Sequence, residues 1–370
     1  MNRELFVIYV IVWAVWLWIG RTLFARLGIL DKPWKDVPAR DPVPTLQWVV
    51  VILLFIVLLY ISKVVLWLDY IGREFLWLFV WWGIIAAMSV VDEMWRIVHS
   101  RYRLSAGVRL AVQILVAWLA WYISGIWVTS IQVPLFGWFD LSVFTSLLVT
   151  IAWFVLFVNA INRSDGIYGL ATGNSSIGFL TIFLLITLVV FPTYEFMSLE
   201  QSELLIRVQV ISLALFVLSL LATILEYKPL WLMRDVWVMF FGFALGYLSL
   251  LWWAKIGTIV VVLALPLFDA VWVMFDRIKN GVSPFQGTWI HLHYRLMTLG
   301  RNRHEVRWFI RWWSLFFMTV MLVLWADRNG KVLVFAAMAL VFFGTNIYLF
   351  WVKKLPYEYG LQNEEGYEET

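Results

Sequence analysis

Long apolar runs recur along nearly the whole chain, and they constrain its fold more than any other feature. Each run has 17–22 residues, and a helix of that length crosses roughly 30 Å of hydrocarbon. Charged residues make up only 14% of the chain, against about 25% in soluble domains. The runs cover residues 4–20, 46–66, 74–91, 107–127, 141–161, 172–192, 204–225, 236–253, 256–275, 308–325 and 332–352. The sequence therefore predicts an all-α polytopic membrane protein with about eleven transmembrane helices.

Lys and Arg are divided unequally between the alternate loops that connect these runs. One set of loops holds 21 of them and the other set holds seven. Positively charged loops stay in the cytoplasm, so we expect the N-terminus outside and the C-terminus inside, in the inner (plasma) membrane. We further expect one transmembrane domain over residues 1–352 and a short acidic cytoplasmic tail at 353–370. The expected cytoplasmic active-site loops are 21–45, 92–106, 226–235 and 276–307.

Composition excludes several kinds of site. The chain has no Cys, so disulfides, zinc–thiolate centres and thiol nucleophiles are ruled out. The first apolar run has no small-residue cleavage site after it, and we interpret it as a retained helix. Glycine-rich nucleotide motifs are absent and the basic loops adjoin the membrane, so nucleic acid is not an expected partner.

Nearly all residues that could perform chemistry lie at the predicted cytoplasmic ends of the helices. Ionisable groups at membrane depth cost about 2.5–3.5 kcal/mol on insertion scales, so they are usually paired or functional. Each carboxylate alone could simply pair with a nearby Arg, whereas several converging beside a basic loop suit a divalent metal and a polyphosphate. The clusters are Asp92-Glu93, Asn159/Asn162/Asp165, Asp235, Asp269, and His291/His293 beside Arg295.

One of these clusters has a regular spacing. In NAINRSDGIYGLATG, which begins at Asn159, polar residues recur at i, i+3 and i+6. On a helix this spacing spreads them over about 120° of one face. Gly166 and Gly169 then permit a turn and the close approach of a ligand to the backbone. The segment resembles the N-x-x-N-x-x-D-G-x-x-G-L signature of the polyprenyl-phosphate N-acetylhexosamine-1-phosphate transferases, membrane enzymes of cell-wall and surface-polysaccharide synthesis.

Further segments resemble the same family in the same order, over residues from about 28 to 300. They comprise Gly28–Pro33 with Pro42-Val-Pro44, Asp92-Glu93 followed by Leu104-Ser105 and Gln113, Asp235 followed by Phe240–Gly246, Pro266–Asp269, Ser283-Pro284-Phe285, and His291–Leu296. The last loop is more similar to the branch that uses UDP-N-acetylglucosamine than to the muramyl-pentapeptide branch.

The resemblance implies that a sugar 1-phosphate, an N-acetylhexosamine 1-phosphate by the match, passes from a UDP-sugar to a polyprenyl phosphate such as undecaprenyl phosphate, with release of UMP. It implies Mg²⁺ as cofactor, with Mn²⁺ as an alternative, and a homodimer. By the match, Asp235 and Asp92 bind the metal, and Asp92 takes a proton from the lipid phosphate. Asp92, Glu93 and Asp165 form the catalytic set. The substrate-binding set is Asn159, Asn162, Asp269, His291, His293 and Arg295.

Three segments depart from the family pattern. The second residue of the family's Asp-Asp pair is Glu93 here, which keeps the charge but is one methylene longer. The family has Gly-Asp-Ser-Gly around its metal-binding Asp, where this chain has Arg234-Asp235-Val236-Trp237. It has Arg and Gly-Gly after the Pro-x-Pro segment, where this chain has Thr45-Leu46-Gln47-Trp48. If the glycines make room for phosphate, Arg234 and Trp237 block part of that pocket. Two alternatives therefore remain: a degenerate member that binds a lipid phosphate or acts as a scaffold, and a flippase or transporter of an anionic lipid. The sequence does not identify the sugar, the polyprenol or the polymer.

Overall fold

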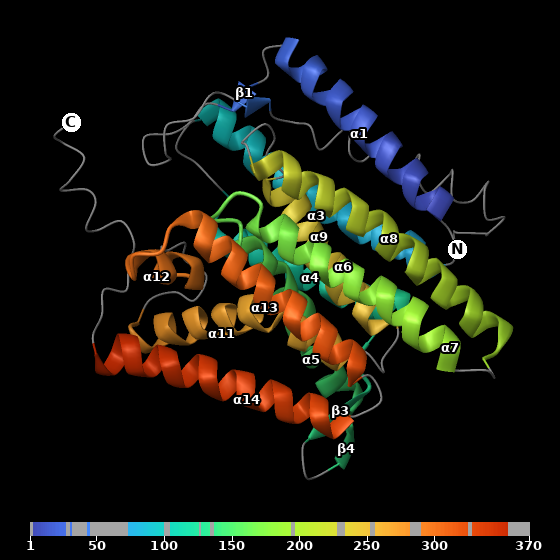
Figure 1. The fold of residues 1–370 in the computed structure, drawn as a ribbon, viewed down its shortest axis with the longest axis vertical. Helices are drawn as coiled ribbons and strands as arrows, with labels where there is room; N and C mark the ends of the chain where they lie inside the picture. Colours follow the sequence, from blue (N-terminus) through green and yellow to red (C-terminus); the bar gives the residue numbers. More distant parts are fainter. Residues whose placement is uncertain are drawn as a thin grey trace.

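The computed structural model consists almost entirely of helices that run side by side (Figure 1). It describes residues 3–26, 30–31, 43–44, 73–99, 104–125, 127–133, 137–193, 197–227, 234–251, 256–281, 290–324 and 328–353. The first part contains α1 (Arg3–Arg26), β1 (Leu30–Asp31), β2 (Val43–Pro44), α3 (Arg73–His99), α4 (Ala106–Ser124), β3 (Ser130–Val133), β4 (Gly137–Asp140) and α5 (Val143–Arg163). The middle contains α6 (Leu170–Leu185), the π-helix η1 (Ile186–Val190), α7 (Phe191–Thr193), α8 (Leu199–Tyr227) and α9 (Arg234–Leu250). The last part contains α10 (Ile256–Val262), α11 (Ala264–Lys279), α12 (Leu292–Thr298), α13 (Arg303–Val323), α14 (Arg328–Asn346) and the π-helix η3 (Ile347–Val352).

The helices confirm an all-α membrane protein. Within the described ranges, six helices are long and apolar enough to cross a membrane: Ala106–Ser124, Val143–Arg163, Leu170–Thr193, Leu199–Tyr227, Arg303–Val323 and Asn329–Val352. Two shorter apolar helices are Val80–Asp92 and Asp235–Leu250. The predicted run at 46–66 lies outside the described residues. The total of eleven and the orientation therefore stay predictions.

Two small antiparallel sheets interrupt the helices. Leu30 pairs with Pro44 and Asp31 with Val43, so an interior segment of the expected first cytoplasmic loop pairs with the C-terminal end of that loop. The hairpin of β3 and β4 occupies the connection between α4 and α5, with Ser130 opposite Asp140. Neither sheet was expected from the apolar pattern, because both lie in connections between the predicted spans.

Close packing of α5 against α9 aligns the first part of the bundle. A Cβ added to Gly242 would lie 2.7 Å from both the Phe157 carbonyl oxygen and the Val158 Cα. Only glycine lets the two backbones approach this closely. Trp153 Nε1 also donates to the Gly246 carbonyl across the same interface at 3.1 Å. The Gly242-x-x-x-Gly246 spacing thus marks helix packing.

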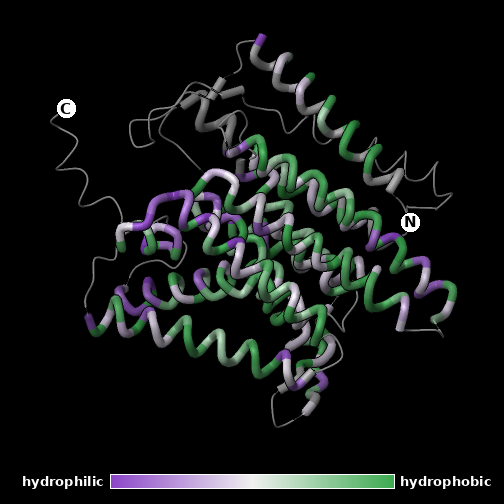
Figure 2. Tube along the Cα trace, in the orientation of Figure 1, coloured by the Kyte–Doolittle hydropathy of each residue, from purple (hydrophilic) through white to green (hydrophobic). Residues whose placement is uncertain are grey.

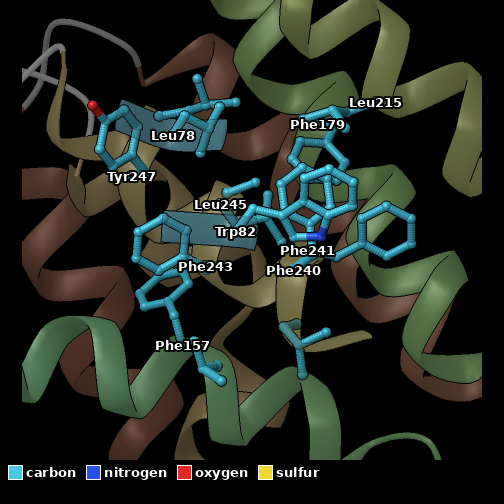
Figure 3. Close-up of a cluster of buried hydrophobic side chains, with 14 of the residues drawn as sticks. Leu78, Trp82, Phe157, Phe179, Leu215, Phe240, Phe241, Phe243, Leu245 and Tyr247 are labelled. Atoms are coloured by element: carbon cyan, nitrogen blue, oxygen red, sulfur yellow. The ribbon is translucent and has the colours of Figure 1, made fainter. Parts of the chain in front are cut away.

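Two apolar clusters form the interior. The larger one joins α3, α5, α6, α8 and α9 and is rich in aromatic rings (Figure 3). In it Trp82 lies 4.9 Å from Phe240, measured between ring centroids. The smaller cluster joins α10, α11, α13 and α14, and it includes Ile167 from the connection between α5 and α6 and Leu170 at the start of α6. That connection therefore lies where the two clusters meet.

Hydrophilic residues gather at one end of the bundle. Figure 2 shows them around α12, the C-terminal end of α11 and the N-terminal end of α13. Away from this end, most residues of the long helices are hydrophobic, as contact with lipid requires.

Gly242→Ala should destabilise the protein by about 1–3 kcal/mol, because the new methyl group meets backbone atoms that cannot rotate away. Gly344→Ala in α14 is the matched control, since no atom lies within 4 Å of its added Cβ. We would compare thermal unfolding in detergent. An unfolding temperature in Gly242→Ala equal to that of the control would contradict the close α5–α9 contact.

Candidate functional site

The connection between α5 and α6 carries the motif residues. Helix α5 ends at Arg163, so Asp165 lies in a turn beyond the helix, and the expected single helical face is wrong for this residue. Gly169 has φ 75°, which confirms the expected turn, since this backbone conformation favours glycine. A Cβ at Gly166 would collide with the ring of His293. The missing side chain of Gly166 thus admits a histidine of the last loop.

Two asparagines on the last turns of α5 connect this helix to its neighbours. Asn159 Nδ2 donates to Gln113 Oε1 on α4 at 2.6 Å and to the Val155 carbonyl at 2.8 Å. Asn162 Nδ2 donates to Asp235 Oδ1 on α9 at 3.2 Å. The second hydrogen bond joins two motif segments that are 73 residues apart, which spacing alone could not have shown.

Three carboxylates interact electrostatically around the turn. The pKa of Asp165 is raised well above its usual value of 3.8, first by burial and then by the negative charges of Glu226 and Asp235. Glu226, at the end of α8, is only 2% exposed and accepts a hydrogen bond from Thr172 Oγ1 at 2.8 Å. Sequence reasoning missed Glu226. The sequence does indicate this residue in one way, because Glu226 is an acidic residue that directly follows a long apolar run.

Asp92 lies at the same end of the bundle. Ser89 Oγ on α3 donates to Met239 Sδ on α9 at 3.7 Å. Asp92 is three residues after Ser89 and Asp235 is four residues before Met239, so each lies about one helical turn from this contact. Asp92 is buried, and its Oδ1 accepts from the Leu104 backbone N–H at 2.5 Å. The Glu93 side chain is outside the described part of the structure.

A second cluster is centred on Asp269 in α11. Its Oδ2 lies 3.0 Å from His291 Nδ1, and its Oδ1 accepts from the Leu292 N–H at 2.8 Å. Arg295 also donates to Oδ1, and through its other terminal nitrogen to Asn346 in α14. Sequence analysis placed Arg295 on a basic loop, but its side chain is 1% exposed. These contacts hold α12 onto α11 and α14, so Asp269 and Arg295 position the loop.

The two histidines of α12 and its N-terminus are kept neutral. Burial lowers the pKa of His293 to about 3, and the neighbouring His291 lowers it further in the same direction. Burial also lowers the pKa of His291, although the hydrogen bond and charge of Asp269 oppose the shift. The rings of the two residues are nearly parallel, with centroids 6.0 Å apart. Neutral imidazoles can donate or accept hydrogen bonds, but they do not neutralise a diphosphate.

Two arginines of α13 hold the turn from the other side. Arg307 Nη1 donates to the Tyr168 carbonyl at 2.7 Å, and Arg311 Nη2 donates to the Gly169 carbonyl. The Arg307 guanidinium also lies 3.8 Å from the centroid of the Tyr227 ring, a favourable cation–π contact. Sequence analysis counted both arginines only as positive charge near the membrane. The structure places them in a helix, buried against consecutive carbonyls.

The carboxylates of Asp165, Glu226 and Asp235 suit a divalent cation both in their negative charge and in their oxygen donor atoms. Carboxylate oxygens are the ligands that Mg²⁺ prefers, and the raised pKa of Asp165 shows like charges that a cation would relieve. Among the described residues, however, no three acidic or histidine side chains lie close enough together to enclose an ion.

The Trp237 substitution does not occupy space beside Asp235. Its side chain is fully buried in the larger apolar cluster. The ring centroid lies 5.3 Å from that of Trp82 and 5.4 Å from that of Phe240. Val236 is buried in the same cluster. The Trp237 ring thus lies in the apolar cluster, and the expected block of a phosphate pocket stays a prediction. The side chains of Arg234, Gln47 and Trp48 lie outside what the structure describes.

Comparisons with known proteins show what the sequence is similar to. The family model of glycosyl transferase family 4 matches residues 75–253. A probable undecaprenyl-phosphate N-acetylglucosaminyl 1-phosphate transferase of Bacillus subtilis is 29% identical, over 59% of this chain and 56% of its own length. An undecaprenyl-phosphate alpha-N-acetylglucosaminyl 1-phosphate transferase of Yersinia pestis is 24% identical, over 81% and 78%. A phospho-N-acetylmuramoyl-pentapeptide-transferase of Latilactobacillus sakei is 29% identical, over 64% and 70%. The match thus spans little more than half the length of the first of these relatives.

Acid should destabilise the protein through His293. Its pKa is about 3 in the fold and 6.5 ordinarily, so between these values the unfolded chain binds more protons and stability falls as the pH decreases. The loss at pH 5 amounts to about 2 kcal/mol. We would measure thermal unfolding of the wild type and His293→Gln at pH 7.5 and pH 5, and expect the variant to lose less. Equal losses would show that His293 is not buried as a neutral group.

Proposed function

We propose that this chain, which is similar to glycosyl transferase family 4 and to undecaprenyl-phosphate N-acetylglucosaminyl 1-phosphate transferases, transfers a sugar 1-phosphate from a UDP-sugar to a polyprenyl phosphate. The observation that carries the proposal is the meeting of the Asn162–Asp165 motif with Asp235, 73 residues away, at 3.2 Å. This first membrane-bound step would supply cell-wall or surface-polysaccharide synthesis. The site faces the cytoplasm in the orientation that the charge distribution predicts.

The reaction balances without a covalent intermediate on the protein. An oxygen of the lipid phosphate attacks the phosphorus that bears the sugar, a new P–O–P bond forms, and the anhydride bond to UMP breaks. Both reactants are anionic, so alignment and charge neutralisation account for most of the catalysis. Asp92, at the end of α3 and hydrogen-bonded to the Leu104 N–H just before α4, accepts the proton of the attacking phosphate, with Glu93 beside it in sequence.

Asp165, Asp235 and Asp92 supply the oxygen donors for Mg²⁺ or Mn²⁺ in this proposal. The bound cation would neutralise charge on the two phosphates of the donor. Asn162 fixes the orientation of Asp235 through their hydrogen bond, and Asn159 fixes the end of α5 against α4. Asp269 and Arg295 hold the α12 loop, so that His293 approaches the turn at Gly166.

The burial of Trp237 favours turnover over a degenerate binding protein. A bulky residue at this position would argue against activity if it stood in the phosphate site, but its ring packs with Trp82 and Phe240 instead. The acidic side chains that the chemistry needs all remain in the sequence. The homodimer expected from the family is untested by these observations.

Wild-type protein in detergent, given undecaprenyl phosphate, Mg²⁺ and a panel of UDP-sugars, should release UMP with at least one donor. Asp235→Asn should reduce the rate on the order of 10²–10³-fold, because a charge-stabilising group at the reacting phosphates is lost. Asp140→Asn, an exposed residue of β4, is the matched control and should retain activity. Chelation of the metal should abolish UMP release, and Mg²⁺ or Mn²⁺ should restore it.

The other readings make different predictions in the same preparation. UMP absent with every donor, together with retained binding of the lipid phosphate, would favour the degenerate protein. Movement of lipid across vesicles without any nucleotide sugar would favour a flippase. Equal activity in Asp235→Asn and the wild type would contradict the assignment of Asp235.

A further inference from the structure

The hairpin of β3 and β4 has an apolar face and a polar face. Ile131 lies opposite Phe139 in the antiparallel register, and Ser130 lies opposite Asp140 in the neighbouring pair. Cross-strand partners share a face of the sheet, and successive residues of a strand alternate between faces. The Ile131 and Phe139 side chains are both exposed, and so is Asp140. The hairpin is therefore amphipathic where it joins the helices.

Two membrane-crossing helices place the hairpin at a boundary of the bilayer. Helix α4 ends at Ser124 and α5 begins at Val143, and both are long and apolar enough to cross a membrane. The 21 residues of α5 measure about 31 Å, close to the thickness of the hydrocarbon core. Its other end carries Asn159 and Asn162. The hairpin thus lies at the boundary opposite the candidate site, and Figure 1 shows it at the far end of α5 from α12.

Contacts on both sides of the hairpin attach it to α5. Val128, just before β3, is buried in the larger apolar cluster. Its backbone N–H donates to Thr150 Oγ1 on α5 at 3.0 Å. After β4, the Leu141 N–H donates to the Thr129 carbonyl at 2.8 Å. These contacts fix the orientation of the hairpin, so its apolar face stays turned outward.

Exposed aromatic side chains adjoin the hairpin. Tyr122, in the last turn of α4, stacks on Trp118 with ring centroids 5.8 Å apart, and Trp127, just before β3, is exposed. Phe144, in the first turn of α5, is exposed as well. Trp and Tyr favour the headgroup zone, where the ring and its polar atom are both accommodated. The surface around the hairpin thus has the composition of a membrane–water interface.

The backbone limits how deeply the hairpin can lie. The sheet has two strands, so each strand has an outer edge whose N–H and C=O groups find no partner within the sheet. Hydrocarbon does not admit open sheet edges, whereas the hydrated headgroup zone does. The apolar face favours lipid, while the open edges and the Asp140 carboxylate favour water. The headgroup zone satisfies both.

We propose that the β3–β4 hairpin is an interfacial anchor, with its Ile131–Phe139 face against the lipid bilayer and its Ser130–Asp140 face in water. The bilayer is the partner because the exposed face continues directly into two helices that cross it. The anchor holds the end of α5 at a fixed depth. This inference does not depend on the proposed transferase function, and its tests need no nucleotide sugar.

Single cysteines test the two faces, because the chain has no Cys of its own. Ile131→Cys, Phe139→Cys, Ser130→Cys and Asp140→Cys would each be spin-labelled in the full chain, in nanodiscs of phosphatidylcholine and phosphatidylglycerol. Oxygen concentrates in lipid and a neutral nickel chelate stays in water, and power saturation measures the accessibility of the label to each. The ratio of oxygen to nickel accessibility should be several-fold higher at positions 131 and 139 than at positions 130 and 140.

Unlabelled wild-type protein in the same nanodiscs controls for disturbance by the label. Hydroxyl radicals generated in water oxidise the side chains that water reaches, and mass spectrometry locates the products. Ile131 is 37% exposed, and Leu299, in the polar connection between α12 and α13, is 41% exposed. Ile131 should be oxidised several-fold less than Leu299, because lipid covers it. Equal oxidation of these two aliphatic side chains overturns the inference.

A label on α5 tests the anchoring role. Leu148 is an exposed position of this helix, so a spin label at Leu148→Cys reports its depth in the bilayer. Replacement of both Ile131 and Phe139 by Ser should shift that depth, whereas Ser130→Ala on the polar face should leave it unchanged. An unshifted label in the double variant overturns the anchoring role.

Other surroundings of the hairpin give distinct results in the spin-label experiment. Equal nickel accessibility at all four positions means that the hairpin stands in water, which overturns the inference. Oxygen accessibility without nickel accessibility at all four positions places the whole hairpin in hydrocarbon and also overturns it. Low accessibility of positions 131 and 139 to both reagents, with spin–spin broadening, means that a second copy of the chain covers the face in place of lipid.

Discussion

Non-helical backbone that is buried must find its hydrogen bonds inside the protein, and the turn between α5 and α6 shows how this chain meets that requirement. Residues 164–169 leave helical geometry at the meeting point of the two apolar clusters. Arg307 and Arg311 meet the demand by donating to the Tyr168 and Gly169 carbonyls. Two charged side chains can therefore be buried in α13, and the turn that carries Asp165 is held in place.

The same turn concentrates unfavourable interactions that ligands can relieve. Burial and the negative charges of Glu226 and Asp235 raise the pKa of Asp165, and among the residues that the structure describes the side chain of Asn174 has no hydrogen-bond partner. Such features lower stability in the absence of ligand and are typical of sites adapted for binding. Asp269 is the contrast, because three partners satisfy it fully and make it an anchor.

The substitution at Trp237, which departs from the family pattern, has a different meaning in the fold than in the sequence. A Trp in place of a small residue beside the metal-binding Asp suggests obstruction when only the chain is considered. In the fold, positions 235 and 237 point to different surroundings, since successive residues on a helix are about 100° apart. Asp235 meets Asn162 and the acidic cluster, whereas Trp237 fills the space beside Trp82.

Apolar run lengths and motif residues by themselves determined that this protein is an all-helical membrane protein with acidic groups at helix ends, because lipid admits few alternatives to the helix. The sequence also marked Asn162, Asp165 and Asp235 as a set. Only the tertiary structure decided which groups meet. Glu226, Asn174 and Arg311 carry no motif, and Arg295 looked like a solvated loop charge although it is buried beside Asp269. Contacts between helices depend on rotation and packing across long separations in sequence, and no local spacing encodes them.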